Sequence, residues 1–187
     1  MYYVLDEAPL GSTEDLAVVD EYPRIELDAW LLGRRFRVPI PEPLTIVLDD
    51  TAPGRMPEYF KGTIPLMSNR LLAALTAAGV DNIDMYRAEI RRGDGSLASS
   101  DYKAVNVIGV ISAANMAEST VAEGLPVELI ATSFDSIVID EKKAGGLLMF
   151  RLAEGVTTLL VHERVKRHLE AKGFGALGFI EPENWMT

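Results

Sequence analysis

A pattern of strand, helix and strand occurs twice in this chain, and it constrains the fold more than any other feature of the sequence. The first copy covers 64–88, and the second follows 94 positions further along. Both copies have a short apolar strand followed directly by a helical pattern, which predicts two similar strand-helix-strand units. The aligned residues are Leu66-Met67-Ser68-Asn69-Arg70 with Leu160-Val161-His162-Glu163-Arg164, and Leu75, Ala77 and Gly79 with Leu169, Ala171 and Gly173.

Both predicted helices end at a glycine. Gly79 and Gly173 stand where a helix needs a residue with positive φ, and glycine adopts that conformation without a steric clash at Cβ. Each is followed by one large apolar residue, Val80 or Phe174, which we expect to fold back on its helix. The shared pattern is explained either by an internal duplication or by two modules that follow the same packing rules, and the sequence leaves both open.

The remaining pattern predicts an α+β protein with a mixed, largely antiparallel sheet, the two strand-helix-strand units and an irregular acidic N-terminal arm. Ser68 is the expected N-cap of the first helix. Period-two alternation in 86–91, followed by a turn at 93–96, predicts a hairpin whose second strand, 102–111, is central in the sheet. Further strands are expected at 2–5, 44–48, 127–131, 136–139 and 147–152, and a short helix at 112–116.

The size and composition indicate one globular unit. With 187 residues, 48% of them hydrophobic, the chain can bury a core, and we expect a single domain over 1–187. Within it, 1–60 is acidic and proline-rich and differs in composition from 61–187. The absence of cysteine excludes a disulfide framework and thiolate catalysis. The N-terminal residues do not resemble a signal peptide and no apolar run has the length of a membrane span, which predicts a cytoplasmic protein.

The charge of the chain limits its partners. There are 28 acidic and 18 basic residues, which gives a net charge of −10. Nucleic acids and anionic membranes bind through Lys and Arg, so this charge argues against both as direct partners and favours a basic protein. Surface acids that only maintain solubility are the alternative. The excess is greatest in 1–28, where one arginine, Arg24, accompanies Asp6, Glu7, Glu14, Asp15, Asp20, Glu21, Glu26 and Asp28.

No motif predicts catalysis, a cofactor or a metal. The string 173–178 has G-x-G-x-x-G spacing, but it follows a helix and leads into a strand, whereas a dinucleotide site requires the opposite order. We interpret it as a helix C-cap and a strand that another backbone approaches closely. His162-Glu163 begins like a zinc-protease helix, yet Lys166 replaces the second histidine. His168 is rotated by about 240° from His162, so the two share no ligand face.

Acidic and aromatic side chains towards the two ends of the chain are the candidate partner-binding residues. Trp30 lies beside the acidic arm and Trp185 beside two glutamates, and large aromatic residues near charges often anchor interfaces. A core position is the alternative for both tryptophans, and for Trp30 we favour it. The candidate set is Asp15, Asp20, Glu21, Asp28, Trp30, Glu181, Glu183 and Trp185.

Several segments of the chain, taken in their order and spacing, resemble one bacterial family. They are Pro65–Leu71 with Gly79, the strand Tyr102–Val107, 115–119, Leu148–Arg151, and Leu159–Val165 with Gly173-Phe174. In these segments the chain is similar to immunity family eleven of the polymorphic-toxin systems, formerly a domain of unknown function, and 61–187 is the expected family core. His162 and Asn115 depart from the family, which often has Ser and Asp at these places.

The resemblance implies a protein without catalysis or cofactor that is encoded beside a toxin, binds it in the cytosol and keeps sister cells alive. Many such toxins are nucleases or otherwise modify nucleic acids, so an acidic inhibitor complements their basic grooves. Two alternatives stay open. One is a small-ligand-binding protein or enzyme that uses His162 and His168, and the other is a scaffold protein that assembles through its strands.

Overall fold

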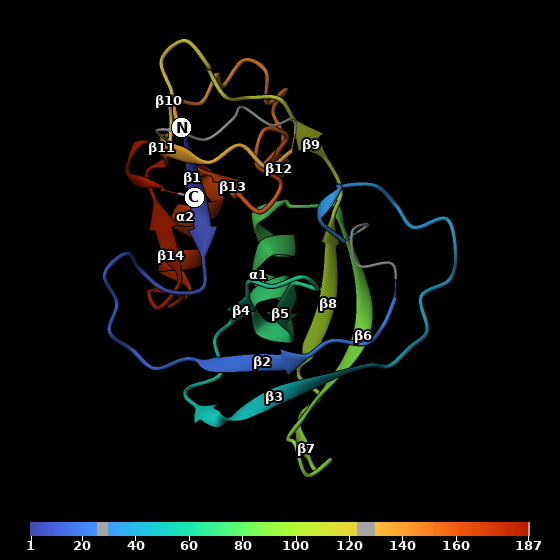
Figure 1. Ribbon diagram of the computed structural model, residues 1–187. Coiled ribbons are helices and arrows are strands. Elements are labelled where there is room, and N and C mark those ends of the chain that lie inside the picture. Colours follow the sequence, from blue (N-terminus) through green and yellow to red (C-terminus); the bar gives the residue numbers. More distant parts are fainter. Residues whose placement is uncertain (26–29, 123–129, 187) are drawn as a thin grey trace.

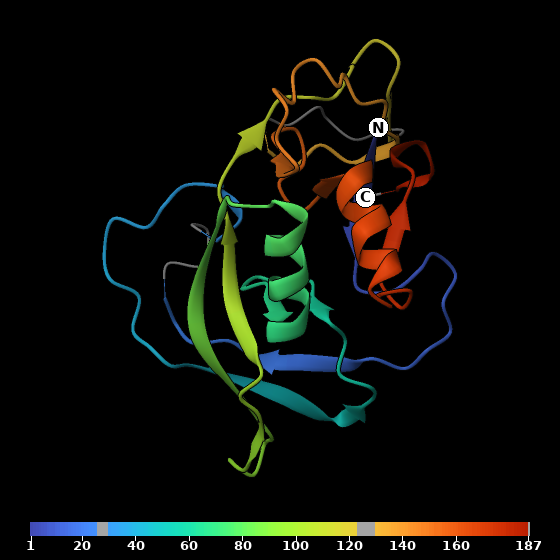
Figure 2. The ribbon, with the colours of Figure 1, turned by 180° about the vertical axis from the view of Figure 1, so that it is seen from behind.

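The computed structural model describes residues 1–25, 30–122 and 130–186. It shows an α+β fold in which mixed, mostly antiparallel sheets pack against two α-helices, as the sequence predicts (Figure 1). The helices α1 (Asn69–Ala78) and α2 (Glu163–Ala171) lie side by side (Figure 2). Each covers one face of its own sheet, so the fold has two sheet-and-helix halves that meet along the helices.

The larger sheet has the strand order β2-β3-β6-β8-β5-β4, and β7 pairs with β6. The β3–β6 pair is parallel and the other pairs are antiparallel. As predicted, the second hairpin strand, β8, is central, between β6 and β5, but it covers only 102–107 of the expected 102–111, because 110–111 pair in the other sheet. The strands are β2 (Ala17–Glu21), β3 (Leu44–Pro53), β4 (Tyr59–Phe60), β5 (Leu66–Ser68), β6 (Ile83–Arg91), β7 (Leu97–Ser99) and β8 (Tyr102–Val107).

The smaller sheet joins the two ends of the chain. Its strand order is β14-β1-β13-β12-β9, and only the β12–β9 pair is parallel. A separate two-stranded ribbon pairs β10 with β11. The elements are β1 (Tyr2–Asp6), β9 (Val110–Ile111), β10 (Thr120–Val121), β11 (Phe134–Ser136), β12 (Met149–Leu152), β13 (Leu159–His162), β14 (Gly178–Ile180) and the 3₁₀ helix η2 (Pro182–Asn184).

The two repeated units have the same topology. In the first, β5, α1 and β6 follow one another, and β8 lies between the two strands. In the second, β13, α2 and β14 follow one another, and β1 lies between the two strands. Because both inserted strands are antiparallel to their neighbours, the strands before and after each helix run parallel. The sequence repeat is therefore a repeat of architecture.

The caps of the two helices are also equivalent. The Ser68 hydroxyl accepts a hydrogen bond from the Leu71 N–H, as predicted, and His162 Nδ1 accepts one from the Arg164 N–H. Gly79 and Gly173 both have the expected positive φ, of 97° and 81°. Behind each glycine, the N–H of the next residue, Val80 or Phe174, donates to a carbonyl in the last turn of the helix, and both side chains are buried. Local sequence thus fixes where each helix begins and ends.

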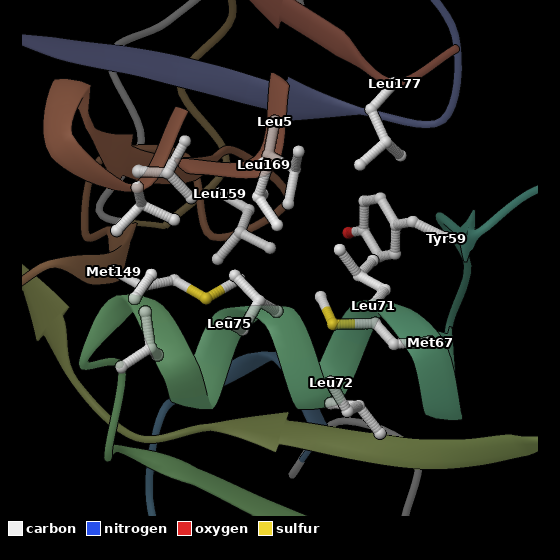
Figure 3. Close-up of a cluster of buried hydrophobic side chains, with 14 of the residues drawn as sticks. Leu5, Tyr59, Met67, Leu71, Leu72, Leu75, Met149, Leu159, Leu169 and Leu177 are labelled. Atoms are coloured by element: carbon white, nitrogen blue, oxygen red, sulfur yellow. The ribbon is translucent and has the colours of Figure 1, made fainter. Parts of the chain in front are cut away.

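Apolar side chains from both helices fill the space between the sheets. Leu71 and Leu75 of α1 point toward Leu159 and Leu169 of the second unit (Figure 3). Each of these four leucines is at most 1% exposed, and burying one stabilises the fold by about 1.5–3 kcal/mol. Two further clusters cover the outer faces of the sheets, one of them around the wholly buried Trp30.

Two arginines at equivalent repeat positions hold the helices in an antiparallel pair. Arg164, near the start of α2, donates from Nη2 to the Ala78 carbonyl at the end of α1, at 2.9 Å. Arg70, near the start of α1, donates from Nη2 to the carbonyls of Lys172 and Gly173 after α2, at 3.0 and 3.3 Å. Helix C-terminal carbonyls lack intrahelical partners and carry partial negative charge, so each guanidinium satisfies them.

Four predictions need correction. The strand from Leu44 does not stop at Asp49 but continues to Pro53, since this end is largely exposed and its acids stay solvated. No helix forms at 112–116, because the Ser112 hydroxyl donates to Glu154 instead of capping a helix. The arm is not irregular throughout, since 17–21 pairs with β3. Of the strand expected at 136–139, only Ser136 lies in β11, and 127–129 of another expected strand lie outside the described residues.

The arginine exchange predicts a measurable loss of stability. Arg164→Ala should lower the free energy of unfolding by about 1–2 kcal/mol, because a charged hydrogen bond to the end of α1 is lost. Arg167→Ala is the matched control on the same helix, since Arg167 is exposed and, among the described residues, pairs only with Glu163; it should cost less than about 0.5 kcal/mol. Urea denaturation of both variants measures the difference, and equal losses would contradict the role assigned to Arg164.

Candidate functional site

The surroundings of both histidines fit a role in the structure of the fold. His162 uses Nδ1 to cap α2, and its ring lies edge-on to Tyr2 with the ring centroids 5.2 Å apart. His168 is partly buried, and its Nε2 has no hydrogen-bond partner in the part of the chain that the structure describes. Within that part, no serine or carboxylate is hydrogen-bonded to either imidazole. The arrangement therefore offers no pair of nucleophile and general base.

The glycine-rich string 173–178 follows α2 and leads into β14. As this order predicts, its glycines serve the structure of the fold. Gly173 ends the helix, and Gly178 begins β14 against the loop that follows β1. A Cβ at Gly178 would lie 2.2 Å from the Ala8 carbonyl oxygen, a distance that no side chain tolerates. By contrast, a Cβ at Gly175 would meet no atom within 4 Å. The absence of a side chain at Gly178 thus allows the 7–12 loop to lie directly against β14.

The acidic arm is anchored at its backbone and exposed at its side chains. The Asp15 carbonyl accepts a hydrogen bond from the Arg55 N–H at 2.9 Å, and Glu14 pairs with the Arg55 guanidinium. Asp15, and Asp20 and Glu21 on the edge strand β2, are exposed. Asp28, the fourth candidate in this region, lies outside the described residues.

The two tryptophan candidates are core residues. Trp30 is fully buried and stacks edge-on with Phe36 and Tyr86. Trp185 is 9% exposed, packs in the cluster on the outer face of the smaller sheet, and is covered by the Lys61 ammonium 4.2 Å from its ring centroid. Neither indole is exposed enough to contact a partner in this structure. At both places the large apolar ring is buried in the core. The acidic neighbours of Trp185, Glu181 and Glu183, are exposed.

An open hollow on the described surface lies where the two ends of the chain meet. It has a volume of about 410 Å³ and is lined by polar and apolar surface in nearly equal parts, with residues of β1, the 7–12 loop, α2, β14 and η2 around it. Ile180 is buried in its wall, whereas Leu10 is 66% exposed at its edge. The lining residues are Tyr3, Pro9, Leu10, Lys166, Phe179, Ile180, Glu181 and Asn184.

A second hollow of about 310 Å³ adjoins the first, because Pro9, Leu10 and Ile180 line both. It adds charged side chains, Asp6, Glu7 and Lys61, and it reaches Leu16 of the acidic arm. We call the two hollows together the terminal groove. The groove thus brings one candidate from the C-terminal end, Glu181, close to the start of the N-terminal arm.

In the terminal groove the positive charges are paired with carboxylates, whereas two carboxylates form no ion pair with any described residue. Lys61 Nζ lies 3.6 Å from Asp6, and Lys166 Nζ lies 2.7 Å from Glu170 and over the rings of Tyr3 and Phe179. Both cations are therefore already paired. Glu7 and Glu181 form no ion pair with any described residue; they accept hydrogen bonds from the Lys61 N–H and the Asn184 amide.

Glu7 is the most desolvated of these carboxylates. Its side chain is partly buried, and this burial raises the pKa of the carboxyl, although the Lys61 N–H lowers it. A carboxylate with a raised pKa is one whose negative charge is poorly stabilised by its surroundings. An approaching cation would supply the missing stabilisation.

Sequence reasoning missed Leu10 and Phe179 as surface residues of interest. Leu10 stands in a Pro-Leu-Gly sequence within an acidic, otherwise polar segment, which is a local signal for an exposed apolar side chain. Phe179 carries no such signal, since its exposure depends on how the 7–12 loop packs against β14. In the described ranges no group of three potential metal ligands occurs, and no helix there has the length and apolarity to cross a membrane.

The described residues thus form an α+β fold with an open groove where the two ends of the chain meet. The chain matches the model of the immunity protein family Imm11 over residues 10–184, and it therefore belongs to that family. This confirms the resemblance seen in the sequence and supports a toxin-neutralising immunity function. No curated protein matches the chain.

The close approach at Gly178 predicts a position-specific effect of added volume. Gly178→Ala should lower the free energy of unfolding by about 1–3 kcal/mol, because the new methyl group forces the 7–12 loop away from β14. Gly175→Ala, in the same string, is the control and should change stability by less than about 0.5 kcal/mol. Thermal and urea unfolding of both variants test this, and a tolerated Gly178→Ala would show that the loop is not held there.

Proposed function

We propose that this protein protects the cell that makes it by forming a stoichiometric complex with a cognate toxin in the cytoplasm, and that the toxin is a basic enzyme acting on nucleic acids, most simply a nuclease. The family match over 10–184 carries the proposal. The net charge of −10 supports the choice of toxin, because a nuclease needs a basic groove for its substrate.

Exposed acids without ion-pair partners support the charge argument more directly than the net charge does. Five of the candidate residues are exposed, and none of them pairs with a cation in the part of the chain that is described: Asp15, Asp20, Glu21, Glu181 and Glu183. Uncompensated surface charge steers an oppositely charged partner during encounter and discriminates among partners. We assign these acids that steering role.

Asp15 of the arm and Glu181 of the C-terminal segment border one surface. Leu16, which follows Asp15, lines the same hollow as Ile180, which precedes Glu181. A basic toxin approaching this surface would meet carboxylates from the arm and from the C-terminal segment together. This arrangement favours binding by the described surface over assembly through the strands.

Co-expression tests the proposed function. When the toxin gene encoded beside this protein is expressed, growth should stop, and the protein should restore it and co-elute with the toxin at equal stoichiometry. Association should slow as salt rises, because the steering charges are screened. The triple variant Asp15→Lys, Asp20→Lys, Glu21→Lys should associate about tenfold or more slowly while unfolding at the wild-type midpoint.

A catalytically inactive form of the same toxin is the control for growth, since it should be harmless with or without this protein. If the protein neither restores growth nor co-elutes with the toxin, the proposed function is wrong. If it protects but the triple variant associates at the wild-type rate, the arm does not steer the toxin.

A further inference from the structure

We propose that the terminal groove is the docking site of the cognate toxin, and that it receives a toxin segment in which a lysine or arginine lies next to an apolar side chain. This inference rests on the proposed function and specifies its interface. It is carried by an open hollow with both polar and apolar surface, an exposed leucine at its edge, and two lining carboxylates that form no ion pair with a described residue.

The floor of the groove is suited to an apolar anchor. Tyr3, Phe179 and Ile180 present their side chains to the larger hollow, and its volume of about 410 Å³ exceeds that of any single side chain. Leu10 is 66% exposed beside this floor although it lies in a short loop among acids. An interface gains most of its energy where a large side chain fills a pocket of this kind and water is excluded around it.

The charge of the groove selects a cation for the same segment. Its two lysines are neutralised by Asp6 and Glu170 and lie over aromatic rings, so they do not repel a further cation as free ammonium groups would. Glu7 and Glu181, one in each hollow, form no ion pair with any residue that the structure describes. An arginine or lysine can lay its apolar stem along the floor and bring its charge to these carboxylates.

The walls of the groove are packed against regular elements of the fold, which favours binding without a large cost in ordering. β14 and the 7–12 loop are held together at Gly178 and Ala8, and β14 pairs with β1. Lys166 extends from α2, whose ends are fixed by the His162 cap and by Arg70. A preformed site loses less conformational freedom on binding than a loop that folds around its partner.

Titration calorimetry with the purified, catalytically inactive toxin encoded beside this protein tests the inference. Leu10→Ala and Glu181→Lys should each weaken the complex about tenfold or more, because an anchor contact or a cation partner is lost. Leu97→Ala on β7 and Glu118→Lys are the matched controls at exposed positions outside the groove, and both should bind as wild type does. All four side chains are exposed, so unchanged unfolding midpoints are expected.

The outcomes separate this inference from the proposed function. If the wild-type protein binds the toxin and both groove variants bind equally well, the groove is not the docking site, although the proposed function stands. If the wild-type protein does not bind the toxin, the proposed function fails and the inference with it. If sedimentation shows that the toxin-free protein self-associates and that Leu10→Ala abolishes this, the groove is an interface between copies, which also overturns the inference.

Discussion

Two arginine side chains, each crossing to the end of the opposite helix, determine how the halves of this protein fit together. Arg70 and Arg164 satisfy carbonyls that a helix cannot satisfy itself, and they do so only if α1 and α2 run antiparallel in contact. Gly79 is needed for its positive φ at the end of α1, and it also bears on this exchange. A Cβ there would lie 2.6 Å from Arg164 Nη2 and would displace the guanidinium from its place beside the helix end. The leucines between the helices then supply most of the free energy.

This central pair of helices is scaffold, and the proposed binding surface lies at its margin. The second unit contributes one wall of the terminal groove through Lys166 and β14, whereas the first unit lies deeper in the fold and contributes none of the lining residues. The groove also depends on the N-terminal strand, which enters the second unit as its middle strand and carries the 7–12 loop to β14. The two units therefore have the same architecture but different surroundings. Only in the second unit does the chain continue from the inserted strand, β1, into an exposed acidic segment.

Local signals predicted the parts of the fold that local chemistry decides. Ser68, Gly79 and Gly173 could be assigned from sequence because helix caps depend on neighbouring residues, and the reversed order around Gly178 was enough to exclude a dinucleotide site. The pairing of β1 inside the second unit could not be predicted, since it joins residues at opposite ends of the chain. The groove could not be predicted for the same reason. Leu10 is far from Lys166 and Phe179 in the sequence, and the three line one hollow only when the 7–12 loop packs against β14. Glu181, selected for its acidity, lines this groove, whereas Trp30 and Trp185 are buried, as the alternative of a core position predicts.

The measurement that tests this account most directly is hydrogen–deuterium exchange of the protein alone and in its complex with the inactive toxin. Amides in 7–12 and 178–184 should exchange more slowly in the complex, while those of the hairpin formed by β6 and β7 should exchange at the same rate in both samples. Protection of that hairpin with unchanged exchange in 7–12 and 178–184 would contradict the account, because the toxin would then dock on the larger sheet and the terminal groove would have no part in neutralisation.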